Sequence, residues 1–168
     1  HESRLSAADY LQLVAATNYK QRVRKTIEYY HADRLNYAVT GTPNRLEYEL
    51  GFFVKNGDGA ADIKPIAHLY KTEVYGMARY LGLPAAITTT TPTTDTFSLP
   101  QGQDEFYFGL PFEQMDVALW MVNSGRPTEE IAAHFGSTVD IASEIVASIA
   151  SKKRAADYLH AGPMHLLD

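Results

Sequence analysis

Asn18 and Arg22 have the side-chain types and the spacing needed to bind an anion. They lie four residues apart in a segment with helical periodicity, so the amide and the guanidinium share one helix face. Together the two groups can hold one carboxylate or phosphate. The alternative is an ordinary solvated basic helix face.

Lys71 stands close to the predicted start of a helix, where the helix dipole is already positive. A bound anion would remove this electrostatic conflict. Phosphate is the natural candidate because unpaired backbone amides at a helix start also point toward it. The alternative is that the flexible lysine side chain extends into water.

Glu47 and Asp58 are the candidate metal ligands. Glu47 falls just inside a predicted helix, and Asp58 stands between Gly57 and Gly59 in a turn. Carboxylates beside phosphate-binding groups suit Mg²⁺, because phosphate oxygens and water complete its octahedron. Each residue can also be read alone, Glu47 as an N-terminal helix charge and Asp58 as a turn residue.

The elements that must position these side chains are mostly helical. Periodicity predicts one strand over residues 35–41, with Thr42 as the N-cap of the helix that follows it and Pro43 in its first turn. The apolar spacing predicts helices over residues 7–31, 70–81, 112–122, 127–135 and 138–158 and a threonine-rich loop over 88–96. A strand edge needs a partner, so these elements describe an unfinished sheet.

Length and composition define one domain over residues 1–168. The 168 residues are 45% hydrophobic and carry a formal net charge of −5, which provides no basic field for nucleic acid or anionic lipid. No stretch reaches the ~18 apolar residues of a membrane span, so we expect a cytoplasmic protein without membrane or nucleic-acid partners. The absence of cysteine excludes disulfides, thiolate zinc sites and a cysteine nucleophile within the chain.

Five motifs in order resemble ammonia-dependent NAD synthetases. The motifs are Asn18-Tyr19-Lys20-Gln21-Arg22-Val23-Arg24, Thr40-Gly41-Thr42-Pro43-Asn44-Arg45-Leu46-Glu47, residues 51–62 (GFFVKNGDGAAD), Leu69-Tyr70-Lys71 and Pro92-Thr93-Thr94-Asp95. Asp104-Glu105, Gly109-Leu110 and Asp116 are similar to the acidic loop and the following helix of that family. The resemblance covers roughly residues 10 to 155.

The resemblance implies an α/β fold, the adenine-nucleotide α-hydrolase-like sandwich with a parallel sheet, represented here by its helix-rich C-terminal half. It also implies ATP-driven amidation of deamido-NAD by ammonia in a homodimer. Asn18 and Arg22 would then hold the dinucleotide, Asp58 would face the nicotinate ring, Thr42, Lys71 and Thr93 would contact ATP, and Glu47 would bind Mg²⁺. Lys153, with Asp58 and Lys71, would complete the catalytic residues.

The sequence departs from the family pattern in two places. The family's His-Lys pair over ATP is replaced by Lys152-Lys153, and its Ser-Gly-Gly-x-Asp-Ser pyrophosphatase loop is absent from this chain. The alternatives are therefore a catalytically incomplete synthetase-like fragment or a binding and dimerisation module. A further alternative is a DNA-binding helix-turn-helix over residues 129–154, although its second helix offers Asp140 and Glu144 to the phosphates.

Overall fold

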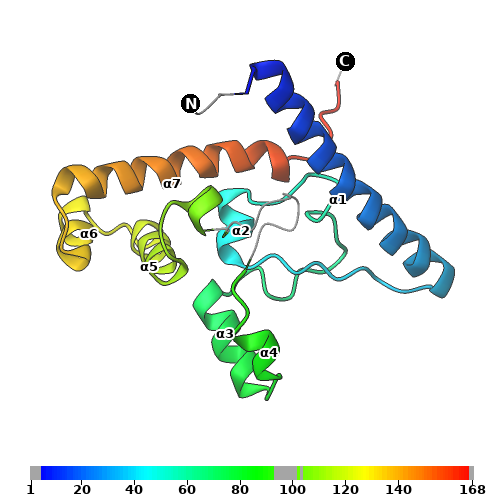
Figure 1. The fold of residues 1–168 in the computed structure, drawn as a ribbon, viewed down its shortest axis with the longest axis horizontal. Helices are drawn as coiled ribbons and strands as arrows, with labels where there is room; N and C mark the ends of the chain where they lie inside the picture. The colour runs from blue at the N-terminus through cyan, green and yellow to red at the C-terminus, as the bar shows by residue number, and fades with distance from the viewer. Residues whose placement is uncertain (1–4, 93–101, 103, 167–168) are drawn as a thin grey trace.

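The computed structural model describes residues 5–92, 102 and 104–166, and these residues are mainly helical. The elements are α1 (Ala7–Leu35), α2 (Arg45–Leu50), α3 (Lys71–Tyr80), α4 (Ala85–Thr88), the π-helical turn η1 (Asp104–Phe108), α5 (Phe112–Asn123), α6 (Thr128–Phe135) and α7 (Val139–His160). Figure 1 shows α2 near the centre, with α7 running across one side, α1 descending along another and α3 with α4 projecting outward.

The predicted strand over residues 35–41 does not form within the described residues. Helix α1 continues to Leu35 and ends at Asn36, which adopts the left-handed conformation with φ of 55°. A single parallel bridge then joins Thr40 to Ile63. The carboxylate of Asp62 accepts the amide hydrogen of Val39 at 2.7 Å, so this amide is not available to extend the strand pairing. The parallel sheet of the predicted fold class is thus reduced to one bridge in this part of the chain.

Helix α2 begins later than predicted. Its N-cap is Asn44, whose side chain accepts the Glu47 amide at 3.2 Å, while Glu47 accepts the Asn44 amide at 2.9 Å. Thr42 and Pro43 precede this capping box in the connecting loop, so the prediction of Thr42 as the cap is wrong. The reciprocal bonds satisfy two donors that the helix itself cannot, which makes Asn44 the better start.

The core lies between α2, η1, α5 and α7. Its fully buried side chains include Leu46 and Leu50 of α2, Met115 and Leu119 of α5, and Ile149 of α7. A second cluster joins α5, α6 and α7; its members are Met121, Ile131, Ala132 and Ala142. The predicted helices over residues 112–122, 127–135 and 138–158 are confirmed with shifts of up to two residues at their ends.

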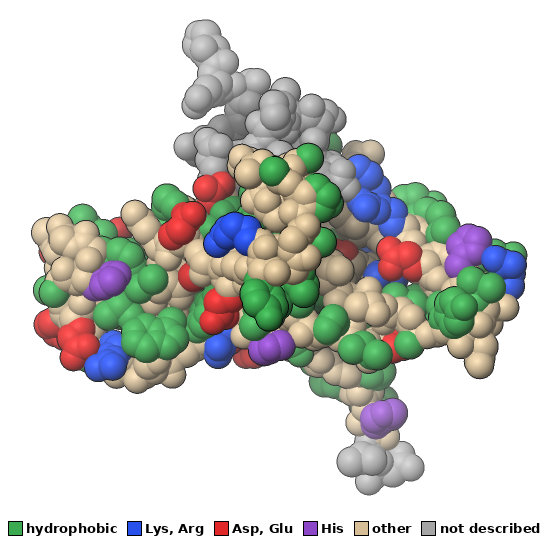
Figure 2. Space-filling model, turned by 90° about the horizontal axis from the view of Figure 1, so that it is seen from below, with side chains coloured by type: hydrophobic (Ala, Val, Ile, Leu, Met, Phe, Trp, Pro, Cys, Tyr) green, Lys and Arg blue, Asp and Glu red, His purple; other side chains and the backbone are tan. Residues whose placement is uncertain are grey.

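Helix α1 contributes little to this core. Only Lys25 and Ala32 are buried on it, whereas the apolar residues that predicted the helix are exposed, including Leu11, Tyr19 and Ile27. At the end of the molecule that α1 occupies, Figure 2 shows hydrophobic side chains among charged ones at the surface. The periodicity therefore predicted the helix correctly, although its apolar side chains are mostly exposed in this structure.

Helices α6 and α7 follow one another across a turn at Gly136, which has φ of 60°. The two helices of the helix-turn-helix alternative thus form, and its DNA-binding role is untested. Helix α7 packs Ala142 and Ile149 into the two core clusters, so much of its length is used for tertiary packing.

Of the helices that the structure describes, none has the length and apolar character to cross a membrane.

Candidate functional site

Glu47 is the central carboxylate of the site. It is the third residue of α2, where one of its oxygens accepts the Asn44 amide. Burial raises the pKa of Glu47; the hydrogen bond from Asn44 and the charge of Lys71 oppose this rise, and the charge of Asp58 adds to it. The ammonium of Lys71 and the carboxyl group of Asp58 are therefore each close enough to act electrostatically on the Glu47 carboxyl group.

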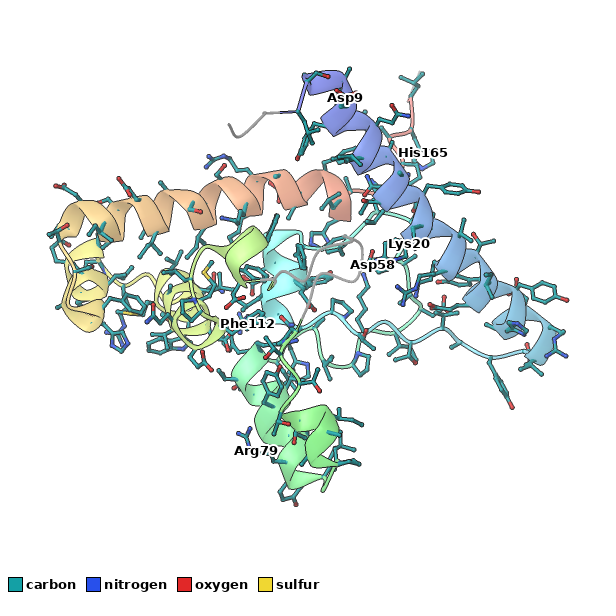
Figure 3. The ribbon with its side chains drawn as sticks, in the orientation of Figure 1. Asp9, Lys20, Asp58, Arg79, Phe112 and His165 are labelled. Carbon is teal, nitrogen blue, oxygen red and sulfur yellow. The ribbon has the colours of Figure 1, made fainter. Side chains whose placement is uncertain are left out.

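Lys71 is the first residue of α3, in agreement with the sequence prediction. Its ammonium lies 5.5 Å from the ring centroid of Phe112 and 5.6 Å from that of Tyr75. Figure 3 places Phe112 beside the start of α3. Two aromatic faces from α3 and α5 thus limit the positions available to the ammonium group.

The anion expected at the start of α3 is already supplied by the protein. The buried carboxylate of Asp116, on α5, accepts the Lys71 amide at 3.2 Å and the Thr72 amide at 2.7 Å. These are the amides that the sequence analysis assigned to phosphate, so that part of the prediction is wrong. The Lys71 side chain remains available to a ligand, whereas those two backbone amides do not.

Asp58 is held in the tight turn that follows α2. Its carboxylate accepts the Val54 amide at 2.9 Å. Desolvation raises the pKa of Asp58, and the Val54 hydrogen bond together with the charges of Lys25 and Arg24 opposes this rise. A Cβ atom at position 59 would lie 2.2 Å from the ring of Phe53, which explains the glycine after the carboxylate.

Helix α1 lies against this turn. Arg22 donates from Nε to the carbonyl oxygen of Lys55 at 3.2 Å. Gln21 packs against Gly57, where an added Cβ atom would lie 3.1 Å from the Cβ atom of Gln21. Figure 3 shows Asp58 in the region between α1 and α2. The structure therefore brings Arg22 and Asp58 to one turn, with Asn18 half-buried one helical turn before Arg22.

The structure does not bring the remaining predicted residues into contact with Glu47, Lys71 or Asp58 within the part of the chain that it describes. Thr42 is exposed in the loop before α2, and Thr93 lies outside the described residues. Lys153 is in the middle of α7, where its ammonium donates to Asn123 at 2.5 Å and pairs with Glu49 at 3.1 Å. These contacts occupy Lys153 with protein groups, and its predicted catalytic role remains a prediction.

Glu47 fits a magnesium ion that is shared with a phosphate ligand. No three Asp, Glu or His side chains of the described residues gather as a metal site. Mg²⁺ is usually held by one or two protein carboxylates, with substrate phosphates and water as the other ligands. A half-buried carboxylate that uses one oxygen for its capping bond and keeps the other meets this requirement.

Sequence reasoning missed one cavity near the end of α7. It has a volume of about 430 Å³ and is lined by Tyr48, Phe53, Lys64 and His160, among others. The Lys64 ammonium lies 5.1 Å from the Tyr48 ring centroid, and desolvation lowers the pKa of Lys64. These residues come from separate segments with no shared spacing, so only the fold reveals their proximity.

The charged groups Glu47, Asp58 and Lys71 are of the kinds that a phosphate-bearing ligand and a shared metal would need. The family model described as NAD synthase matches residues 2–156 of this sequence, and the chain belongs to that family. The predicted resemblance is confirmed.

Two curated relatives are especially similar. The NH(3)-dependent NAD(+) synthetase of Mesorhizobium japonicum is 60% identical over 161 residues, which cover 96% of this chain and 50% of the relative. That of Rhizobium meliloti is 58% identical over 160 residues, which cover 95% of this chain and 48% of the relative. The chain thus spans about half the length of the curated relatives it matches.

Two solved structures share the fold. NMN synthetase from Francisella tularensis superposes with a TM-score of 0.73 at 24% identity, covering 92% of this chain and 57% of that protein. The NH3-dependent NAD synthetase from Campylobacter jejuni has a TM-score of 0.65 at 22% identity, covering 99% of this chain and 58% of that protein. The helix-rich arrangement is therefore one that these two synthetases also contain.

Proposed function

We propose that the protein containing this chain is an ammonia-dependent NAD synthetase that amidates deamido-NAD at the expense of ATP. The observation that supports this proposal most directly is that the starts of α2 and α3, which carry Glu47 and Lys71, lie together: the Arg45 amide donates to the Leu69 carbonyl oxygen at 2.8 Å. The chain belongs to the NAD synthase family, and its similar relatives carry the name NH(3)-dependent NAD(+) synthetase.

The proposed reaction has two steps. The nicotinate carboxylate of deamido-NAD attacks the α-phosphorus of ATP, the bond to the β-phosphate breaks, and pyrophosphate leaves. Ammonia then attacks the carbonyl carbon of the resulting adenylate, loses a proton, and expels AMP. Both steps develop negative charge on phosphate oxygens, which a fixed cation stabilises without reorganisation.

Lys71 is the cation proposed to act on ATP. Its position at the start of α3, between the rings of Tyr75 and Phe112, restricts the ammonium group before any ligand binds. Thr42 and Thr93 are proposed as further ATP contacts. When bound by Glu47 and phosphate oxygens, Mg²⁺ would neutralise charge on the departing pyrophosphate.

The other part of the site is proposed to hold deamido-NAD. Arg22 and Asn18 would bind its anionic groups, because they share one face of α1 next to the turn that carries Asp58. Asp58 would then face the nicotinate ring. Lys153, the remaining residue predicted to be catalytic, donates to Asn123 and pairs with Glu49.

The decisive experiment assays the intact gene product with ATP, Mg²⁺, ammonia and deamido-NAD. NAD and AMP should form in equal amounts, and omission of ammonia should abolish NAD. Formation of AMP without deamido-NAD would contradict the proposal. The 168-residue chain, assayed in parallel, tests the alternative that it is a catalytically incomplete part.

We also propose that the intact protein is a homodimer. The exposed apolar side chains of α1, including Tyr10, Leu13 and Val23, form the surface that a second copy would cover. Since the reaction consumes ATP, we infer a cytoplasmic location. Sedimentation of the intact protein measures its oligomeric state directly, and a monomer at micromolar concentration would contradict the dimer.

A further inference from the structure

A polar cluster joins three helices on one side of α2. We name it the Glu49 cluster, and it consists of Arg45, Glu49, Asn123 and Lys153. Glu49 pairs with Arg45 at 2.5 Å and with Lys153 at 3.1 Å, and it accepts the Asn123 amide at 2.9 Å. Lys153 also donates to Asn123 at 2.5 Å. The cluster therefore connects α2, α5 and α7 through one carboxylate.

The cluster is sheltered enough for its geometry to matter. The side chain of Glu49 is 21% exposed and that of Lys153 is 37% exposed. Burial alone would raise the pKa of Glu49, but the bonds from Arg45, Asn123 and Lys153 outweigh it and hold this pKa below its usual value. Arg45 also lies over the Tyr70 ring, 4.8 Å from its centroid, which extends the contacts toward the start of α3.

Helix α2 has only six residues, so its orientation depends on what surrounds it. Leu46 and Leu50 are buried in the core, and Glu49 belongs to the cluster. Glu47, two residues before Glu49, has a different partner: its carboxylate accepts the Asn44 amide at 2.9 Å. The cluster is one of the contacts that orient α2, so we expect its loss to shift α2 and with it the Glu47 carboxylate.

We propose that Lys153 is a positioning residue: through Glu49 it fixes α2 and thereby the carboxylate of Glu47, and it does not contact ATP. This inference rests on the proposed function, in which Glu47 holds Mg²⁺ with ATP. It replaces the catalytic role predicted for Lys153 with one that its contacts define.

The test is a double-mutant cycle in the intact gene product, with Lys153→Met, Glu49→Gln and both together. Arg154→Met is the matched control, because Arg154 is the exposed next residue of the same helix. Two quantities are measured: the affinity for Mn²⁺ in the presence of ATP, from its electron paramagnetic resonance signal, and kcat for NAD formation. The Mn²⁺ measurement needs no turnover, so it remains informative even if the proposed reaction fails.

We expect Lys153→Met and Glu49→Gln each to weaken Mn²⁺ binding by up to about tenfold. This is the low end of the loss of metal affinity that follows removal of a residue that orients a metal ligand. The double variant should be no weaker than the weaker single variant, because each change breaks the same contact. Lys153→Arg should restore most of the affinity, and Arg154→Met should not change it. Unchanged Mn²⁺ affinity, or effects that multiply in the double variant, would overturn the proposal.

Discussion

The helical core and helix α1 differ sharply in how they use their apolar residues. In the core, Leu46, Met115, Leu119 and Ile149 are at most 1% exposed. Helix α1 is longer than any other described element, yet its leucines at positions 11 and 13 are 64% and 49% exposed. These core side chains are therefore buried by the chain's own helices, whereas α1 leaves large apolar side chains exposed.

The same division separates the two parts of the proposed site. Glu47 and Lys71 come from elements packed on the core, and Asp116 of α5 fixes the start of α3. Arg22 comes from α1, where its contact in the chain is the carbonyl oxygen of Lys55. Glu47 and Lys71, proposed to act on ATP and its metal, are thus held by the core of this chain, while Arg22, proposed to bind the dinucleotide, depends on how α1 is held.

The largest expected effect is on stability, and it compares one leucine from each region. Leu119→Ala should destabilise the chain by about 2 to 5 kcal/mol, because it leaves a cavity in the closed core. Leu11→Ala, at an exposed site, should change the free energy of unfolding by less than about 0.5 kcal/mol. Urea unfolding of the 168-residue chain measures both. Equal losses would show that α1 is packed in solution.

Lys71→Ala tests the core side of the site. It removes the fixed cation near the phosphates, so kcat in the intact protein should fall by about a hundredfold, the usual cost of one lost charge-stabilising donor. Steady-state kinetics with varied ATP measures the change. The KM for deamido-NAD should change little. If the variant only raised that KM, Lys71 would instead be assigned to the binding of deamido-NAD.

Arg22→Ala tests the α1 side of the site. Removal of one charged contact to the dinucleotide should raise the KM for deamido-NAD by about tenfold, with kcat nearly unchanged, because uniform binding is lost. Kinetics with varied deamido-NAD measures it. A decrease in kcat with unchanged KM would show instead that Arg22 acts only in the transition state.

The smallest expected effect is a pH dependence of stability due to Asp116. Desolvation raises the pKa of this carboxyl above its usual 3.8, although the Thr72 and Lys71 amides oppose the rise. The folded chain then binds this proton more tightly than the unfolded chain, so Asp116 makes stability fall as pH rises from 3.8 through the raised pKa. Asp116→Asn should remove this slope in urea unfolding at pH 4 to 6. An unchanged slope would contradict it.

Much of the local structure was predictable because it depends on neighbouring residues. The start of α3 at Lys71 and the extents of α5, α6 and α7 followed from apolar spacing and from Gly or Pro at their ends. The Asn44 cap was also readable, since Asn44 and Glu47 have capping-box spacing, but Thr42 offered an earlier cap.

The long-range contacts were not predictable from the sequence. Nothing in the spacing shows that Asp116 binds the amides of Lys71 and Thr72, or that Lys153 pairs with Glu49. The strand predicted over residues 35–41 needs a neighbouring strand along its length, but only Thr40 pairs with another segment here, at Ile63. Side-chain partners that are distant in sequence are chosen by packing, and a single sequence does not record that choice.

The carboxylate of Asp116 has a consequence for selectivity at the start of α3. Because the protein fills its own anion site there, an incoming phosphate meets a resident negative charge instead of open amides. Attraction to a triphosphate at this point depends on the ammonium group of Lys71 and on any accompanying divalent cation. Free nucleotide without its cation should then be the poorer ligand at this end of the site.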